Sequence, residues 1–306
     1  MDELRGKTAF ITGGASGIGL ATAHLLGAEG MNLVVADVEE AALATAEVAL
    51  GAAGYPVLGV RCDVRKVDDL EAAARATIAR FGGVHVVFNN AGVVATGRVE
   101  DLSLQAWEWV IDVNLWGVIH GCRVFLPIMK SQGVPGHIVN TASMAGLNSG
   151  PLMSPYYVSK FGVVALSESV WHECRTDNVP IGVSVLCPGF VKTRIHEADR
   201  NLPADVASAR VGDAGAAFIS MLGAGVEAGR EVSDVAAVIV DSIKAVAFGS
   251  FRTAKSHTAR FVDAPRRSST ELNRRWLGAD DRVGCPPSVQ EVHRPVGARA
   301  VACRGD

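Results

Sequence analysis

The sequence has no run of 18 or more apolar residues, so it predicts no transmembrane helix. Its first residues, Met1-Asp2-Glu3-Leu4-Arg5, contain no apolar stretch, and we therefore expect no secretory signal. The formal net charge is only −3, which gives no global electrostatic case for binding nucleic acid or a membrane surface. These absences together favour a cytoplasmic protein that acts on small molecules.

Cysteine motifs are also missing. The six cysteines are scattered, none forms a Cys-x-x-Cys pair, and no histidine lies at metal-ligand spacing from them. We expect reduced and mostly buried thiols and no metal site. What the sequence does have is an apolar content of 49% over 306 residues, which is enough to bury a sizeable core.

Short β-branched runs alternate with Ala-rich helical stretches from residue 7 to about residue 250. Several of the runs are apolar throughout, as strands covered on both faces should be. This alternation predicts an α/β protein with a parallel sheet and helices on both faces. The predicted strands are Lys7–Thr12, Asn32–Ala36, Val57–Cys62, His85–Asn89, His137–Thr141 and Ile181–Leu186. The predicted helices are Gly17–Glu29, Ala41–Ala52, Val67–Phe81, Leu104–Lys130, Pro155–Thr176 and Ser233–Val246.

Two later segments depart from this alternation. Residues 194–230 are rich in Ala and Gly, and we predict that they form a lid over one end of the sheet. Residues 256–306 form a basic C-terminal extension, in which Ser268–Leu277 has the composition of a short helix. Beyond Gly278 the pattern has no periodicity, and we expect disorder there.

The first strand is followed by a glycine-rich turn. Gly13-x3-Gly17-Ile18-Gly19, with Ser16 before Gly17, lets the backbone approach a pyrophosphate, and the next helix offers free N–H donors at its N-terminus. Such a turn alone is a weak signal, since an ordinary strand-to-helix turn can look the same. It therefore predicts dinucleotide binding only together with the residues that follow.

Polar residues end the next three strands. Asp37, 18 residues after Gly19, can accept hydrogen bonds from the adenosine ribose and would repel a 2′-phosphate, which favours NAD over NADP. Asp37 could equally cap the following helix. Asp63 is placed to reach the adenine amino group, next to Val64. Amide and small side chains that can line the dinucleotide follow at Asn90, Ala91 and Gly92.

A tyrosine and a lysine share one face of the helix that begins near Pro155. Tyr156 and Lys160 are four residues apart, whereas Tyr157 points about 100° away from Tyr156. A phenol near an ammonium and a cationic nicotinamide should have a lowered pKa, which would make it a general base for alcohol oxidation. The alternative is an ordinary aromatic and lysine pair on an amphipathic helix.

Two further polar residues complete a candidate catalytic set. Thr141 and Ser143 follow the fifth strand, at the end of the sheet where ligands bind, and Ser143 is the better candidate to hold a substrate oxygen. Asn114 lies among apolar neighbours in a long helix, and we expect it to hold a water beside Lys160.

Together these residues resemble the short-chain dehydrogenase/reductase superfamily over residues 5–255. The motifs are Thr12-Gly13-x3-Gly17-Ile18-Gly19, Asn89-Asn90-Ala91-Gly92, Asn114, Ser143, Tyr156-x3-Lys160 and Pro188-Gly189-Phe190-Val191-Lys192-Thr193. The resemblance implies one Rossmann-like, doubly wound domain with about seven strands. It also implies a catalytic tetrad of Asn114, Ser143, Tyr156 and Lys160. Pro188, Gly189, Val191 and Thr193 would hold the nicotinamide, and Lys160 its ribose.

A narrower resemblance points to the Cα-dehydrogenases of lignin-derived aryl ethers and their relatives. Apolar residues of the lid, with Leu147, Met153 and Phe190, would line a pocket for a bulky apolar or aromatic secondary alcohol. A steroid or sugar dehydrogenase, or an NAD(H)-binding adaptor without activity, remains an alternative, since the fold does not choose the substrate. The family resemblance also implies a homodimer or homotetramer.

Overall fold

The computed structural model describes residues 1, 3–204, 206, 208–245, 251–255 and 260–263. The predicted helix at Ser268–Leu277 and the expected disorder beyond Gly278 lie outside these residues. The strands are β1 (Thr8–Thr12), β2 (Asn32–Asp37), β3 (Val57–Arg61), β4 (Val86–Asn89), β5 (Gly136–Thr141), β6 (Ile181–Leu186), β7 (Phe251–Lys255) and β8 (Arg260–Asp263). The α-helices are α1 (Gly17–Ala28), α2 (Glu40–Ala52), α3 (Val67–Phe81), α4 (Leu104–Ile111), α5 (Gly117–Gln132), α6 (Ser154–Thr176), α7 (Gly212–Glu227) and α8 (Val232–Ala245).

The strands form one sheet in the order β3-β2-β1-β4-β5-β6-β7-β8. Each neighbouring pair from β3 to β7 is parallel, and β8 adds an antiparallel edge to β7. The order reverses between β1 and β4, so the chain winds in opposite directions on either side of this point. The predicted α/β class and parallel sheet are confirmed, with the antiparallel strand as an addition.

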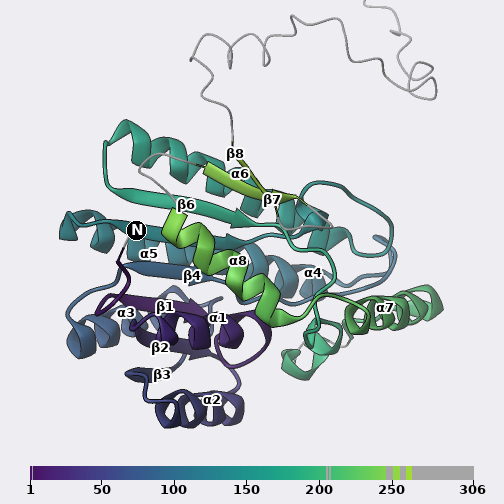
Figure 1. Ribbon diagram of the computed structural model, residues 1–306. Helices are drawn as coiled ribbons and strands as arrows, with labels where there is room; N and C mark the ends of the chain where they lie inside the picture. The colour runs from purple at the N-terminus through teal and green to yellow at the C-terminus, as the bar shows by residue number, and fades with distance from the viewer. Residues whose placement is uncertain (2, 205, 207, 246–250, 256–259, 264–306) are drawn as a thin grey trace, which may run out of the picture. The chain divides into compact units, whose positions relative to one another are not determined.

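Two apolar layers cover the two faces of the sheet. Alternate residues of one strand serve different layers, because successive side chains of a strand point to opposite faces. Ile11 packs with α1, α2 and α8, whereas the adjacent Phe10 packs with α3, α5 and α6. Figure 1 shows α1 and α8 lying over the near face of the sheet. Every residue of β1, β4, β5 and β6 is buried, which explains why these strands are largely apolar.

The long helix predicted for Leu104–Lys130 is interrupted. Between α4 and α5 lies a five-residue π-helical turn, η1 (Asp112–Trp116), which contains Asn114. Such turns carry one extra residue per turn and occur frequently at functional sites. The apolar periodicity continues through it, and this is why the sequence does not reveal the interruption.

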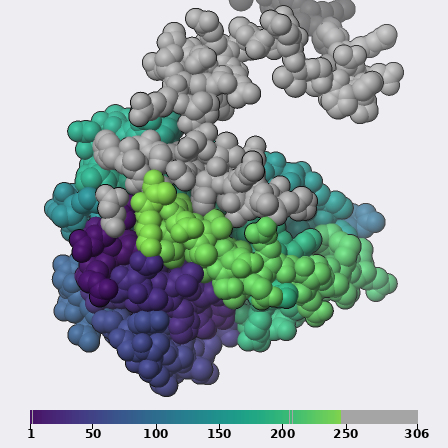
Figure 2. All heavy atoms as spheres, viewed as in Figure 1, coloured from purple at the N-terminus to yellow at the C-terminus, as the bar shows by residue number. Residues whose placement is uncertain are grey.

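The segment 194–230 contains a 3₁₀ turn, η3 (Ile195–Asn201), and α7. Its apolar side chains form a third cluster with α4 and the start of α6, separate from the two layers that cover the sheet. In the space-filling view α7 lies at the edge of the molecule, next to the start of α8 (Figure 2). We call residues 194–230 the lid from here on.

Within the described ranges, no helix is long and apolar enough to cross a bilayer. The same part of the chain holds no group of three or more His, Cys, Asp or Glu side chains arranged for a metal ion. Four of the cysteines (Cys62, Cys122, Cys174 and Cys187) are free and buried. Cys285 and Cys303 lie outside the described residues.

Candidate active site

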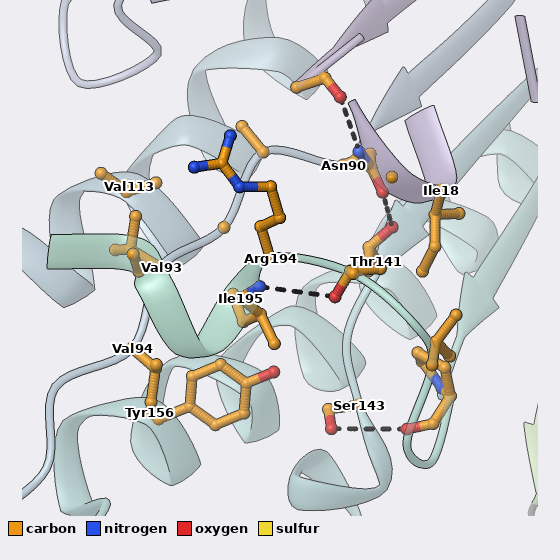
Figure 3. Close-up of a pocket in the computed structure, with 18 of the residues that line it drawn as sticks. Ile18, Asn90, Val93, Val94, Val113, Thr141, Ser143, Tyr156, Arg194 and Ile195 are labelled. Atoms are coloured by element: carbon orange, nitrogen blue, oxygen red, sulfur yellow. Dashed lines mark hydrogen bonds between the residues drawn. The ribbon is translucent and has the colours of Figure 1, made fainter. Parts of the chain in front are cut away.

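A cavity of about 880 Å³ lies at the carboxyl ends of the parallel strands, within the size range of small-molecule sites. Part of its wall is drawn in Figure 3. It brings together nearly all of the residues that the sequence predicts for the site, and only Gly19, Asn114 and Leu147 do not line it. The predicted residues that do line it are Gly13, Ser16, Gly17, Ile18, Asp37, Asp63, Val64, Asn90, Ala91, Gly92, Ser143, Met153, Tyr156, Lys160, Pro188, Gly189, Phe190, Val191 and Thr193.

The glycine-rich turn forms one end of this cavity. Gly13 has a φ of +61°, and an added Cβ would lie 3.0 Å from the Cα of Ala91. Gly19 serves packing, since a Cβ there would lie 2.2 Å from the carbonyl oxygen of Gly13. Ser16 precedes α1 in extended conformation and makes no side-chain cap. The first N–H groups of α1 are therefore left for an anion.

Asp37 is fixed beside the turn by two backbone donors. Its Oδ2 accepts a hydrogen bond from the N–H of Ala15 at 3.1 Å, and its Oδ1 accepts one from the N–H of Glu39 at 3.1 Å. Burial raises the pKa of Asp37, although these two hydrogen bonds oppose the rise. The carboxylate thus ties the turn to the end of β2 and faces the cavity.

Asp63 lines the cavity and is paired with an arginine of the same loop. Its two oxygens accept hydrogen bonds from the guanidinium of Arg65, the closest from Nη2 at 2.7 Å. Burial raises the pKa of Asp63, but the hydrogen bonds from Arg65 outweigh burial and hold the pKa below its usual value. The carboxylate that was expected to meet adenine is therefore engaged by a residue two positions along, and Arg65 itself lines the cavity.

Asn90 connects three strand ends. Its side-chain Nδ2 donates to the carbonyl oxygens of Thr12 and Gly13, each at 3.2 Å, and its Oδ1 accepts from the hydroxyl of Thr141 at 3.4 Å. Its backbone N–H donates to the Thr12 hydroxyl at 2.9 Å. Figure 3 shows the hydrogen bond between Asn90 and Thr141. These bonds fix the ends of β1, β4 and β5 relative to one another.

Ser143, Tyr156 and Lys160 meet on the opposite side of the cavity. Ser143 begins a 3₁₀ turn, η2 (Met144–Gly146), and its hydroxyl forms a hydrogen bond with Tyr156. The Lys160 ammonium donates to the carbonyl oxygen of Thr141 at 2.9 Å and lies 5.5 Å from the centre of the Tyr156 ring. Tyr156 and Lys160 therefore share a helix face, as their spacing predicts.

The acid–base properties of this pair follow from burial. Burial raises the pKa of the Tyr156 hydroxyl, and the hydrogen bond with Ser143 only partly offsets the rise. Burial also lowers the pKa of Lys160 to about 8. In the protein alone, burial of the phenol outweighs its neighbours, and the lowered pKa beside a cationic nicotinamide stays a prediction.

Asn114 is fully buried beneath the site rather than lining it. Its Oδ1 accepts from the N–H of Val93 at 2.8 Å, and its Nδ2 donates to the carbonyl of Val93 at 2.9 Å and to Ser159 at 3.2 Å. These direct bonds tie Asn114 to the loop after β4 and to α6, and the water beside Lys160 stays a prediction. A Cβ at Gly92 would lie 3.4 Å from Asn114 Oδ1 and 3.6 Å from Lys160 Nζ, so the three residues do meet.

The segment after β6 closes the cavity from the lid side. The carbonyl of Pro188 accepts from the N–H of Met144 at 3.0 Å and faces the Ser143 hydroxyl at 3.5 Å. Val191 pairs with Arg230 at the far end of the lid, and a Cβ on Gly17 would lie 3.3 Å from Thr193 Cγ2. The residues expected to hold a nicotinamide thus lie between the glycine-rich turn and Ser143.

Comparisons with known proteins support this reading of the geometry. The profile of the family described as short chain dehydrogenase matches residues 7–203. The chain belongs to this family. It is 34% identical to the CLA biosynthesis dehydrogenase/reductase of Lactiplantibacillus plantarum, covering 67% of this chain and 71% of that protein. It is 37% identical to the C alpha-dehydrogenase of a Sphingobium species, covering 67% of each.

Solved structures agree with the sequence comparisons. A short-chain dehydrogenase/reductase from Burkholderia phymatum in complex with NAD has 44% identity and a TM-score of 0.78, covering 79% of this chain and 87% of that one. LigD from Sphingobium in its apo form has 28% identity and a TM-score of 0.67, with 83% and 91% covered. The superfamily resemblance inferred from the motifs is confirmed.

The oxidoreductases of this family use NAD or NADP. The residues that line the cavity of this chain fit such a dinucleotide. The crowded Gly13 and Gly19 positions bring backbone to the cavity edge, the N-terminus of α1 is open, and a carboxylate ends β2. Such a cofactor would supply or accept a hydride at its nicotinamide ring.

One further part of the cavity wall is apolar and includes residues that the sequence analysis missed. Val93, Val94, Trp109 and Val113 line it from the loop after β4 and from the α4–η1 region. Trp109 and Val113 are four apart, a helical spacing that could have identified this face. Leu147 was wrongly placed in the pocket, because η2 turns the chain so that Leu147 packs with the apolar layer of α6. Met144 and Asn148 line the cavity instead.

Proposed function

We propose that this short-chain dehydrogenase interconverts a secondary alcohol and a ketone, with NAD as its preferred cofactor. The observation that carries the proposal is the shared cavity of the glycine-rich turn and the Ser143, Tyr156 and Lys160 side chains. In the oxidation direction, Tyr156 as a phenolate takes the proton of the substrate hydroxyl, and the hydride of the substrate carbon would pass to the oxidised nicotinamide. In reduction, the same phenol returns the proton to the carbonyl oxygen.

Each neighbour of Tyr156 has a distinct part in this proposal. Ser143 holds the substrate oxygen near the phenol through its hydroxyl. Lys160 places a positive charge beneath the phenol, which favours phenolate, and binds the nicotinamide ribose. Asn114 acts as a positioning residue, because its bonds to Val93 and Ser159 fix the loop after β4 against the catalytic helix.

We infer that NAD is preferred because the Asp37 carboxylate lines the cavity at the end of β2. A carboxylate accepts hydrogen bonds from ribose hydroxyls and repels a 2′-phosphate.

We further propose that the substrate is a bulky apolar or aromatic secondary alcohol. Beyond Tyr156, the cavity is lined by side chains of one apolar cluster, namely Val94, Trp109, Met153, Ile195 and Leu222. Burial of apolar surface contributes about 25 cal/mol per Å², so such a wall favours an aryl or alicyclic group over a polyol. The similarity to a C alpha-dehydrogenase agrees with this choice.

The substrate proposal is tested by kcat/KM for a 1-arylpropanol, a hydroxysteroid and sorbitol with NAD. We expect the aryl alcohol to be oxidised most efficiently, and efficient sorbitol oxidation with inactive aryl alcohols would refute the proposal. Adjacent residues of α7 give a matched control. Leu222→Asn should reduce kcat/KM for the aryl alcohol, whereas Met221→Asn should not, because Met221 is 61% exposed and outside the cavity lining.

Finally, we propose that the protein forms a homodimer or homotetramer through the α4–α5 region and α6. Trp116, Val158 and Phe161 are large apolar side chains on these elements, and each is more than 40% exposed. Light scattering on the purified protein tests this assignment. We expect Phe161→Glu to shift the assembly toward the monomer, and a monomeric unmodified protein would contradict it.

A further inference from the structure

Three arginines of the lid line the cavity, Arg194, Arg200 and Arg230, and the proposed chemistry uses none of them. Arg194 directly follows Thr193 and lines the cavity, with its side chain 57% exposed. Figure 3 shows its guanidinium directed away from the Tyr156 phenol. The guanidinium is therefore not placed to contact the reacting carbon of a substrate.

The position of Arg194 relative to the glycine-rich turn follows from its neighbour. A Cβ added to Gly17, the first residue of α1, would lie 3.3 Å from Thr193 Cγ2, so Thr193 lies close to the start of this helix. The start of α1 is the point at which backbone N–H groups and the helix dipole attract an anion. Arg194 leaves the chain one residue from this point, and an arginine side chain has the length to reach it.

The Arg194 guanidinium pairs with a carboxylate of the lid and keeps further N–H donors for a ligand. Its Nε donates to Glu197 Oε2 at 2.7 Å, which uses one of the five N–H donors of a guanidinium. Arg194 is also among the cations that lower the pKa of Glu39, although burial of Glu39 acts in the opposite direction. Glu39 lies two residues beyond Asp37, so the guanidinium is within electrostatic range of the loop that carries Asp37.

We infer that Arg194 binds the pyrophosphate of the dinucleotide from the lid side, opposite the backbone donors of α1. The inference rests on the proposed dinucleotide function and deepens it. A guanidinium matches phosphate oxygens with paired donors, and hydrogen bonds between charged partners are about twice as strong as neutral ones. The pyrophosphate would thereby be held between a fixed wall and a residue of the lid.

A second lid arginine holds Arg194 in place. Arg200 Nη1 donates to the carbonyl oxygens of Arg194 and Glu197, each at 2.9 Å. The same guanidinium bonds Glu39 through Nε at 2.9 Å, and Asn201 adds a bond to Glu39 at 2.8 Å. We call these contacts of Glu39 with Arg200 and Asn201 the clasp. The clasp fixes the backbone of Arg194 relative to the loop that carries Asp37.

The test compares Arg194→Gln, Arg194→Lys and Arg210→Gln with the unmodified protein. Arg210 is the matched control because it is also a lid arginine, pairs with Asp199 at 2.7 Å and lies outside the cavity lining. Dissociation constants are measured by calorimetry for NADH and ADP-ribose, which share the pyrophosphate, and for adenosine, which lacks it. Each NADH titration is repeated over a series of salt concentrations.

We expect Arg194→Gln to raise the Kd of NADH and of ADP-ribose about tenfold and to leave adenosine binding unchanged. Lysine at the position should restore part of the affinity, and Arg210→Gln should have no effect. The salt dependence of NADH binding should be weaker in Arg194→Gln, since one charge pair with the ligand is lost.

Two results would overturn the inference. One is an NADH Kd within twofold of the unmodified value in Arg194→Gln, and the other is an equal loss in Arg194→Gln and Arg210→Gln. Failure of the proposed function looks different, because the unmodified protein would then bind neither NADH nor ADP-ribose.

Discussion

The two walls of the cavity are built by different means. The wall formed by the sheet and α6 consists of buried polar groups whose partners lie deep in the fold, such as Asn114 with Val93 and Lys160 with Thr141. The lid wall is held by ion pairs between partly exposed side chains, such as Arg200 with Glu39 and Arg210 with Asp199. Breaking a buried polar contact leaves an unsatisfied group, whereas an exposed pair contributes little to stability.

This contrast separates the tasks of the two walls. Proton transfer requires donors and acceptors held within a narrow range of distances, which only a rigid wall provides. Entry of substrate and release of product require a wall that opens, and such segments have low local stability. The predictions below test this division, beginning with the largest expected effect.

Replacing Tyr156 with Phe should reduce kcat by a factor of about 10² to 10⁴, because the group that moves the proton is lost. NADH binding and the melting temperature should change little, since the ring remains and only a buried hydroxyl is removed. Steady-state kinetics with the best alcohol, together with NADH titration, provide the measurement.

Tyr157→Phe is the matched control for this experiment. Tyr157 also lines the cavity but occupies another face of α6. Loss of the Tyr157 hydroxyl should reduce kcat far less than loss of the Tyr156 hydroxyl. A larger reduction of kcat in Tyr157→Phe would show that Tyr157 is the proton donor.

Replacing Asn114 with Ala should lower the free energy of unfolding by several kcal/mol. The N–H and C=O of Val93 would both lose a buried partner, at about 1–3 kcal/mol for each unsatisfied group. Activity should fall as well, because the loop after β4 would no longer be fixed against α6. Urea denaturation of the ligand-free protein measures the first effect.

Asn201→Ala is the corresponding change in the lid. Asn201 also donates a side-chain hydrogen bond, to Glu39, but it is only partly buried. We expect a loss below about 1 kcal/mol, because water can replace the lost partner. Equal losses in the two variants would contradict the proposed difference between the walls.

The Asp37 carboxylate should make NAD the better cofactor by at least tenfold in kcat/KM, or about 1.4 kcal/mol. Asp37→Ser should weaken NAD and relieve the repulsion of NADP. Kinetics with both cofactors test this, and equal use of the two by the unmodified protein would refute the assignment. The fold should tolerate the change, because a serine can still accept from one of the two N–H groups that Asp37 binds.

The sequence predicts the rigid wall far better than the lid. Strand ends carry its polar residues, and parallel topology brings such ends to one edge, so Gly13, Asp37, Asn90 and Ser143 could be grouped without coordinates. The helix spacing likewise identified Tyr156 and Lys160. These inferences depend only on local periodicity and on a single topology rule.

The features that the sequence does not reveal depend on side-chain partners far apart in the chain. The clasp joins Glu39 to residues 161 and 162 positions away, and no pattern marks either end. The engagement of Asp63 by Arg65 is local, but their spacing is equally compatible with a solvent-facing arginine. The placement of Leu147 depended on the 3₁₀ turn η2, which no residue type in Met144–Gly146 demands.

The smallest expected effect concerns the clasp itself. Glu39→Gln retains a side-chain oxygen for Arg200 and Asn201 but removes the charge. The pair is about one-quarter exposed on each side, so we expect a stability loss of about 0.2–1 kcal/mol at pH 7.

The dependence of this loss on pH distinguishes a charge effect from a packing effect. Burial raises the pKa of Glu39, but the bonds from Asn201 and Arg200 outweigh burial and hold the pKa below its usual value. Because the folded-state pKa is lower than the unfolded one, the stabilisation is complete above the usual value of about 4.3. It is lost as the pH falls through the lowered value. The unfolding free energies of the unmodified protein and Glu39→Gln should therefore differ at pH 7 and converge in acid, whereas a constant difference would assign the loss to packing.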